Sequence, residues 1–435
     1  MQPIDTLLLA AHVVPVSSPG ALRDHAVAID AGRIVAVLPR ADAIARFDAR
    51  ETVDLARHAL IPGLVNLHCH AAMTLLRGIA DDQPLMTWLT QHIWPAEAKH
   101  VDDAFVEEGS LVAMAEMLRA GVTCVNDMYF FPEATARAAL RAGMRAAVGL
   151  IVIEFPSAYA TTPQQYLEKG LAMRAAFVGE PLLSFCMAPH APYTVADETF
   201  RRLVALADQH DMPIHTHLHE TRHEVEDGLK QHGVRPFERM RHLGVVGPRL
   251  IAVHAVHLEE VEMDTLARVG AAMAHCPSSN LKLASGFAAV AALRARGVPV
   301  GFGTDGAASN NRLDVLTEMR TGALLAKAVA NDASVIGAHE ALEMATLQGA
   351  RALGLADRIG SIEAGKFADL AAIDLGGLET RPGYDPISDL VYAAGREHVT
   401  DVWVAGTARV RKGELTTLDA NALAATADAW QRKIA

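Results

Sequence analysis

Two histidines one residue apart follow an apolar run that begins at residue 60. The run, LIPGLVNLHCH, is typical of a buried strand and ends in His68 and His70. Side chains at positions i and i+2 of a strand point to the same side, so these two imidazoles converge while Cys69 turns away. Converging imidazoles suit a first-row metal, although such a pair can also arise by chance among 20 histidines. Further ligands must therefore come from elsewhere in the chain.

Later apolar runs supply candidates for those ligands. Their polar residues are His215, His217, His219 and Glu220 in MPIHTHLHE, His254 and His257 in VHAVHL, and Asp305 in GFGTDGAAS. Single histidines of this set could simply pack in the core. Two histidines, a third histidine and an aspartate from three strands nevertheless make a coherent site for a divalent metal ion. These donors suit zinc, and iron or manganese would also bind to them. No predicted strand ends in a lysine that could be carboxylated to bridge a second ion, so we expect one metal.

Eight apolar runs, which alternate with amphipathic stretches, must position these side chains. They cover residues 60–70, 121–130, 144–155, 182–192, 212–220, 249–258, 270–280 and 298–310. Alternation of this kind indicates βα units around parallel strands, and eight strands close a (β/α)₈ barrel with its functional groups at the strands' carboxyl ends. The stretch 102–121 predicts a helix, because acidic residues open it and Gly121 stands where a helix ends.

The two ends of the chain show a different pattern. Residues 1–59 hold alternating strand-like runs with a hairpin turn at DAGR, residues 30–33, and the pattern returns after residue 365. We predict that residues 1–59 and 366–435 together form a small β-sandwich domain beside a catalytic barrel of residues 60–365. In the alternative, the strands at each end cap the barrel separately.

Composition narrows the class of protein. The chain has 435 residues, 51% hydrophobic, and carries 39 Lys and Arg against 51 Asp and Glu, a net charge of -12 that disfavours a nucleic-acid partner. The four cysteines form no CxxC pair, which is typical of reduced residues in a cytoplasmic protein. The N-terminal apolar stretch has Asp5 where a secretion signal would be basic, and no stretch is long enough to predict a membrane span.

Several motifs, taken in order, resemble those of a known family. They are IPGLVNLHCH, APHAPYTV, HTHLHET, VHAVHL, HCPSSNLKLASG and GFGTDGAASNNRLD. Together they are similar to the amidohydrolase superfamily and in particular to its 5-methylthioadenosine/S-adenosylhomocysteine deaminase branch. The resemblance covers nearly the whole chain, including the divided end domain. The motifs are highly specific for the superfamily and less specific for the substrate.

The resemblance implies which residues bind the metal, and which of the candidate histidines are among them. His68 and His70 match the family's HxH pair, and Asp305 matches its aspartate ligand. His217 matches the third histidine, because the family's H-x-x-E motif places that ligand three residues before a glutamate, here Glu220. Strict strand alternation would put Glu220 opposite His217, so the backbone must bend between them.

The resemblance also implies catalytic roles. Asp305 would accept a proton from the attacking water, and His254 would polarise the nucleophile or stabilise the tetrahedral intermediate. Water attack at C6 of adenine requires protonation of N1, for which Glu220 is the candidate general acid and base. The alternative for Glu220 is a surface carboxylate that caps the following helix.

Glu97 and His190 match substrate-binding positions of the family, and Trp88 is a further candidate for the substrate site. Glu97 would bind the ribose hydroxyls, His190 would contact the ribose or the base, and Trp88 would form an apolar wall near the sulfur substituent. For Trp88, as for Trp94, simple packing of a helix on the barrel is the alternative. Arg145 receives no role, because it reaches the substrate only if its part of the chain faces the barrel mouth.

The expected activity is metal-dependent deamination of 5′-methylthioadenosine and S-adenosylhomocysteine, with adenosine and 5′-deoxyadenosine as further substrates, to the inosine analogue and ammonia. One alternative is a sister amidohydrolase that acts on guanine, a pyrimidine or a chlorotriazine. Another is a non-catalytic scaffold, although such relatives typically lose metal ligands that are intact here. We expect a homo-oligomer, a dimer or a tetramer. The CxxC of cytidine-type deaminases and the G-x-S-x-G of serine hydrolases are absent.

Overall fold

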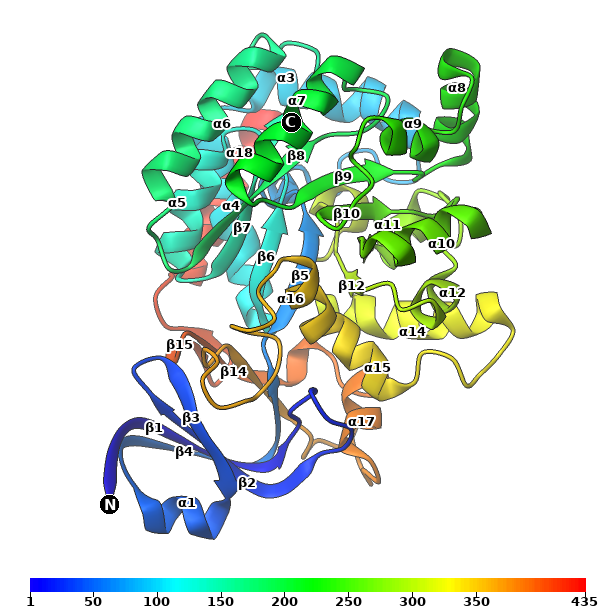
Figure 1. Cartoon of the computed structure of the whole chain (residues 1–435). Coiled ribbons are helices and arrows are strands. Elements are labelled where there is room, and N and C mark those ends of the chain that lie inside the picture. The colour runs from blue at the N-terminus through cyan, green and yellow to red at the C-terminus, as the bar shows by residue number, and fades with distance from the viewer.

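A parallel sheet of eight strands forms the centre of the molecule (Figure 1). The computed structural model describes residues 1–435. In sheet order, which is also chain order, the strands are β5 (Leu64–Cys69), β6 (Val122–Asp127), β7 (Arg145–Val152), β8 (Leu183–Pro189), β9 (Ile214–Leu218), β10 (Leu250–His254), β11 (Ala272–His275) and β12 (Val300–Phe302). Each lies within one of the eight predicted runs, so the predicted (β/α)₈ barrel is confirmed.

The barrel closes where the segment after β12 meets β5. Asp305 N donates to His68 O (3.0 Å), and Thr304 N donates to Asn66 Oδ1 (2.9 Å). Every residue of β5 is buried. Closure therefore brings two segments that are far apart in the sequence, both with predicted metal ligands, within one peptide hydrogen bond of each other.

Helices follow the strands and surround the barrel (Figure 1). They are η1 (Ala71–Leu76), α2 (Leu85–Trp88), η2 (Leu89–Ile93), α3 (Trp94–His100), α4 (Asp103–Arg119), α5 (Pro132–Ala142), α6 (Pro163–Phe177), α7 (Asp197–His210), α8 (Arg222–His232), α9 (Pro236–His242), α10 (Glu260–Val269), α11 (Pro277–Lys282), α12 (Val290–Ala295), α13 (Ala307–Asn310), α14 (Val315–Ala330), α15 (Ala338–Glu343), η3 (Met344–Gln348) and α16 (Gly349–Ala352). The predicted helix at 102–121 is α4: the Asp102 side chain caps it by accepting from Phe105 N (2.8 Å), and the chain turns at Gly121, where φ is +83°.

A second, mixed sheet of eight strands combines both ends of the chain. In sheet order its strands are β16 (Glu414–Leu415), β15 (Thr407–Arg411), β14 (Val399–Val404), β13 (Leu370–Asp374), β4 (Phe47–Pro62), β1 (Gln2–Val13), β2 (Leu22–Asp30) and β3 (Arg33–Pro39). The predicted hairpin turn joins β2 to β3 through Ala31 and Gly32, both with positive φ. The two ends meet where Leu370 of β13 pairs with Pro62 of β4. One apolar cluster, containing Leu8, Ile29 and Trp403, is shared by the two halves of this sheet.

The end segments also contact the barrel. Helix α17 (Pro386–Tyr392) contacts α15, and helix α18 (Ala420–Ile434) lies on α4, where the Trp430 ring meets Phe105 edge to face at 5.2 Å. Strand β4 runs three residues past position 59 before β5 begins. The limits 1–59 with 366–435, and 60–365, stay our proposed domain boundaries.

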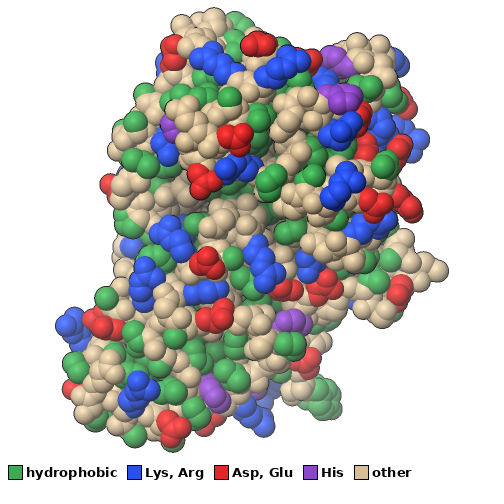
Figure 2. Space-filling model, in the orientation of Figure 1, with side chains coloured by type: hydrophobic (Ala, Val, Ile, Leu, Met, Phe, Trp, Pro, Cys, Tyr) green, Lys and Arg blue, Asp and Glu red, His purple; other side chains and the backbone are tan.

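The surface is mixed in charge on the face drawn in Figure 2, where basic and acidic side chains are interspersed. None of the helices has the length and hydropathy needed to cross a bilayer.

Candidate active site

The predicted metal ligands converge at the carboxyl ends of the barrel strands. His68 is buried near the end of β5, and His70 follows the strand. Their Nε2 atoms lie 3.2 Å and 3.3 Å from Asp305 Oδ1. The ring of His217, from β9, lies 4.9 Å from that of His68 and 5.3 Å from that of His70, centroid to centroid. The structure thus brings all four predicted ligands together.

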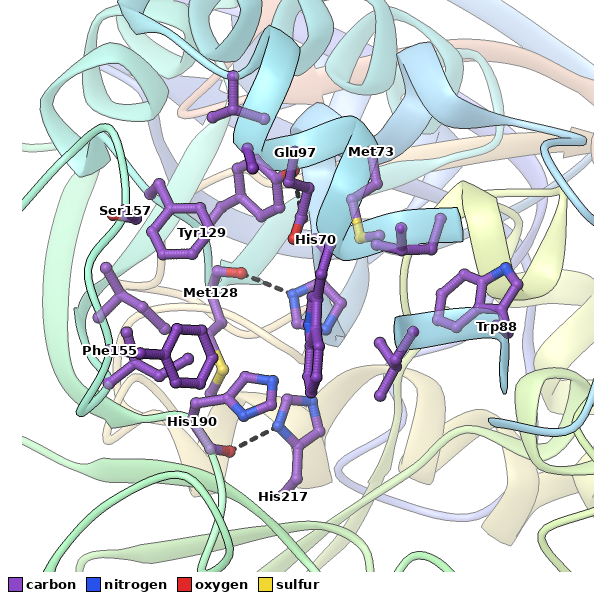
Figure 3. Close-up of a pocket in the computed structure, with 18 of the residues that line it drawn as sticks. His70, Met73, Trp88, Glu97, Met128, Tyr129, Phe155, Ser157, His190 and His217 are labelled. Atoms are coloured by element: carbon purple, nitrogen blue, oxygen red, sulfur yellow. Dashed lines mark hydrogen bonds between the residues drawn. The ribbon is translucent and has the colours of Figure 1, made fainter. Parts of the chain in front are cut away.

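Backbone carbonyls orient two of these histidines, as the dashed lines in Figure 3 show. His70 Nδ1 donates to Met128 O, and His217 Nδ1 donates to His190 O, each at 2.6 Å. Because Nδ1 carries the proton, the lone pair of each ring lies on Nε2. Fixing the outer nitrogen in this way is typical of histidine ligands to metals.

Ligand atoms group in two overlapping sets that share His68. One set is His68, His70 and Asp305; the other is His68, His217 and His254, and within each set the ligand atoms lie within 4.8 Å of one another. The four predicted ligands among these residues, His68, His70, His217 and Asp305, offer three imidazole nitrogens and a carboxylate oxygen. Zinc commonly accepts such donors. The residues therefore fit a divalent transition metal.

Two serine hydroxyls hold the Asp305 carboxylate. Ser279 Oγ and Ser309 Oγ both donate to its Oδ2, each at 2.7 Å, which leaves Oδ1 directed at the imidazoles. Asp305 has φ +59°, a conformation that non-glycine residues rarely adopt. The surrounding contacts thus maintain a strained backbone at a point where chemistry is expected.

Glu220 lies at the same mouth, beyond the end of β9. The expected bend between His217 and Glu220 occurs at His219, where φ is +54°. The buried Glu224 side chain fixes this bend by accepting from His219 N (2.9 Å) and Glu220 N (2.8 Å). As a result, Glu220 Oε2 lies 3.8 Å from His254 Nε2.

His254 itself is oriented by a neighbouring side chain. Its Nδ1 donates to Asn280 Oδ1 (2.8 Å), so the lone pair of Nε2 faces the mouth on the side of Glu220. His254 also has positive φ, at +66°. The predicted catalytic residues Glu220, His254 and Asp305 all line one cavity at this mouth.

Burial controls the charge of several groups here. Burial lowers the pKa of His68 to about 3 and that of His190 to about 3, so both rings are neutral at pH 7. A neutral imidazole is the form that binds metals. Burial also raises the pKa of Glu220, which favours a carboxyl group able to give a proton as well as take one.

A cavity of about 330 Å³ opens above these residues and contains the predicted substrate-binding side chains. Trp88, Glu97 and His190 all line it, together with His70, His217, His254, Glu220 and Asp305. Its size falls within the range of small-molecule sites. Trp88 is buried and faces the cavity, and Trp94 also lines it, although both rings pack with neighbouring apolar side chains as well.

Glu97 is partly buried and paired with a tyrosine. The Tyr129 hydroxyl donates to Glu97 Oε1 (2.6 Å), and Figure 3 shows both side chains above His70. Burial raises the pKa of Glu97 to about 7, against the opposing effect of the Tyr129 hydrogen bond. At neutral pH this carboxyl is therefore close to its midpoint.

Other residues considered from the sequence lie elsewhere. Arg145 begins β7, at the opposite end of the barrel, where its Nε and Nη2 donate to the two carboxylate oxygens of buried Asp369 (2.9 Å and 3.1 Å). His215 contacts His68 from below, with Nε2 2.9 Å from His68 Nδ1. The His219 side chain does not line the cavity, and its Nε2 accepts a hydrogen bond from Phe237 N (3.0 Å).

Four site residues received no role from the sequence alone: Tyr129, Ser279, Asn280 and Ser309. Each lies within a quoted run or motif, but polar residues at strand ends are common. Only contact with Glu97, Asp305 or His254 in the fold distinguishes them.

A family model described as the amidohydrolase family matches residues 59–409. The chain belongs to the amidohydrolase family. This amidohydrolase is 45% identical over 432 residues to a protein of Teredinibacter turnerae named 5-methylthioadenosine/S-adenosylhomocysteine deaminase. The aligned region covers 99% of this chain and 98% of that protein. It is also 45% identical to a protein of the same name from Saccharophagus degradans, over 99% of this chain and 97% of that one.

Solved structures are consistent with this family assignment. A crystal structure described as an adenosine deaminase from Xanthomonas campestris with bound zinc is 52% identical, has a TM-score of 0.99, and covers 100% of this chain and 99% of that one. A zinc-containing atrazine chlorohydrolase from Arthrobacter aurescens is 24% identical, with a TM-score of 0.90 over 98% of this chain and 100% of that one. At that identity the likeness concerns the fold.

Proposed function

We propose that this amidohydrolase deaminates adenine nucleosides, 5′-methylthioadenosine and S-adenosylhomocysteine among them, to the inosine analogue and ammonia. The observation that supports this most strongly is Glu220, held 3.8 Å from His254 at the mouth where His68, His70, His217 and Asp305 converge. The names of the relatives at 45% identity point to the same reaction.

We propose His68, His70, His217 and Asp305 as ligands of one divalent cation, with zinc the first choice because the 52% identical structure is described with bound zinc. Such an ion would lower the pKa of a coordinated water and supply a nucleophile at neutral pH. Fe²⁺ or Mn²⁺ would suit the same donors.

The side chains would divide the proton transfers. Glu220 would protonate N1 of adenine as water adds at C6, which is consistent with a carboxyl whose pKa is raised by burial. Asp305, with Oδ2 held by two serines, would take a proton from the water at Oδ1 and return it to the leaving amine. His254, oriented by Asn280, would direct its Nε2 toward the oxygen that attacks.

The substrate would be held by groups above this centre. Glu97 would accept from the ribose hydroxyls, because Tyr129 fixes its carboxylate beside the cavity. His190, whose Nδ1 is 2.9 Å from Thr194 Oγ1, would contact the ribose or the base, and Trp88 would pack against the 5′ group. A ribose-bearing ligand thus accounts for a partly buried glutamate that a free base would leave unused.

The test is ammonia release by the zinc-loaded protein from 5′-methylthioadenosine, S-adenosylhomocysteine, adenosine, guanine and cytosine, compared as kcat/KM in one buffer. We expect adenine nucleosides to exceed both free bases. Turnover of a free base alone would overturn the substrate assignment and favour a sister hydrolase. A purified protein that holds no metal, and that shows no turnover after zinc is added, would favour a scaffold role. The cytoplasmic location and the homo-oligomer stay predictions from the sequence.

A further inference from the structure

We infer that the cavity selects adenine nucleosides with uncharged, apolar 5′ substituents and discriminates against S-adenosylhomocysteine, whose 5′ chain ends in an amino-acid carboxylate. This inference rests on the proposed deaminase function and concerns the 5′ group within it. It depends on one property of the cavity: the residues that line it include no lysine and no arginine.

The charged groups that do line the cavity are all acidic. They are Glu97, Glu220 and Asp305. Apart from the proposed divalent cation and its ligands, the cavity would therefore offer a substrate carboxylate no lysine or arginine as a partner. Burying a charge without a partner opposes binding.

The remaining walls are apolar and aromatic. Trp88, Leu89 and Ile93 line one part of the cavity, and Phe130 and Phe155 another. Figure 3 shows Trp88 and Phe155 on opposite sides of His70. A methylthio or longer alkylthio group would bury apolar surface against such walls, which favours binding.

Nearby cations are held by other partners. Lys169 Nζ donates to the carbonyl of Tyr159, a lining residue, and lies 5.0 Å from the centre of its ring. Arg239 is buried, donates through Nε to Asp197 (2.7 Å) and donates to backbone carbonyls through its other nitrogens. Neither is free to meet a substrate carboxylate without losing these bonds.

An adjoining cavity of about 210 Å³ does not change this conclusion. It shares Leu85, Tyr193 and Glu220 with the first cavity, so a long 5′ chain could extend toward it. Its lining adds two carboxylates, Glu224 and Asp227, while its one arginine is the engaged Arg239 described above. The amino group of S-adenosylhomocysteine would find carboxylates there, but its carboxylate would meet no lysine and no unengaged arginine.

The first experiment compares three substrates on the zinc-loaded wild-type enzyme: 5′-methylthioadenosine, 5′-butylthioadenosine and S-adenosylhomocysteine. The butylthio analogue matches the long chain without its charges. We expect the two uncharged substrates to have similar kcat/KM and S-adenosylhomocysteine to be at least about tenfold lower, mainly through KM. A kcat/KM for S-adenosylhomocysteine within about threefold of that for 5′-methylthioadenosine would overturn the inference and leave the deaminase function standing. No turnover of any of the three would overturn both.

The second experiment adds the missing cation at Phe155, which lines the cavity and is 38% exposed, so that a long charged side chain fits there. Phe155→Arg should raise the ratio of kcat/KM for S-adenosylhomocysteine to that for 5′-methylthioadenosine by about threefold or more. Phe155→Met removes the ring without adding charge and should leave that ratio unchanged. An equal rise in both variants, or no rise in Phe155→Arg, would count against charge as the cause.

Discussion

At the scale of single residues, Glu220 and His217 are neighbours in the sequence with separable roles. Because Glu220 lies beside His254 and outside the four proposed ligands, Glu220→Gln should keep the metal and lower kcat by about 10²–10⁴-fold. His217→Ala should lose the metal as well. Metal analysis and steady-state kinetics check both. Glu226→Gln, an exposed change on the helix that follows, is the control. Near-normal turnover by Glu220→Gln would refute its proton-transfer role.

The pairing of Tyr129 with Glu97 predicts a pH dependence of substrate binding. With a pKa of about 7, Glu97 is protonated below neutral pH and then accepts ribose hydroxyls less well, so KM should rise as pH falls through 7. The Tyr129 hydroxyl favours the ionised form, and its loss in Tyr129→Phe should raise the pKa of Glu97. The rise in KM should then begin at a higher pH.

KM and kcat measured from pH 5.5 to about 9, a span that brackets both ionisation states, test this shift. Tyr166→Phe is the control, because the Tyr166 hydroxyl donates to Ser157 and not to Glu97. A KM profile that stays in place in Tyr129→Phe would contradict the role of this pair.

At the scale of elements, the close approach of the segment after β12 to β5 depends on Gly303. A Cβ at this position would lie 2.8 Å from His68 Cβ and 2.9 Å from His68 N. Gly303→Ala should therefore displace His68, destabilise the protein by about 1–3 kcal/mol and weaken metal binding. Thermal unfolding and zinc content measure the two effects. Gly337→Ala, where an added Cβ has nothing within 4 Å, is the matched control and should change neither.

The strands were predictable from the sequence, and the contacts that orient the side chains of the site were not. Each barrel strand is a short apolar run, a local signal that needs no knowledge of the fold. The candidate ligands followed because strand ends in a barrel share one mouth, whereas the choice of His217 among the histidines came from the resemblance to the family's H-x-x-E motif. By contrast, Tyr129 meets Glu97 across 32 residues, and Asn280 meets His254 across 26. No periodicity encodes such contacts. The short helices α2, η2 and α3, which carry Trp88 and Glu97, likewise lack a clear amphipathic repeat.

At the scale of the whole molecule, a buried ion pair joins the barrel to the end sheet. Arg145 donates twice to Asp369, which also accepts from Ala405 N (2.7 Å). Removing one partner leaves the other charge buried, so Asp369→Ala should lower the free energy of unfolding by about 3–5 kcal/mol. Denaturant unfolding tests this against Asp208→Ala, which removes an exposed partner of Arg249 and should cost at most about 1 kcal/mol. Equal losses would contradict a special role for the buried pair.

The pairing of β13 with β4 has a consequence for how the protein is made. Leu370 pairs with Pro62, so about three hundred residues must leave the ribosome before that side of β4 gains its partner. Until then β4 presents an unpaired edge, the kind of surface that joins strands from other chains. Newly made chains should thus be prone to aggregation, and dependent on chaperones, from the emergence of β4 until β13 arrives.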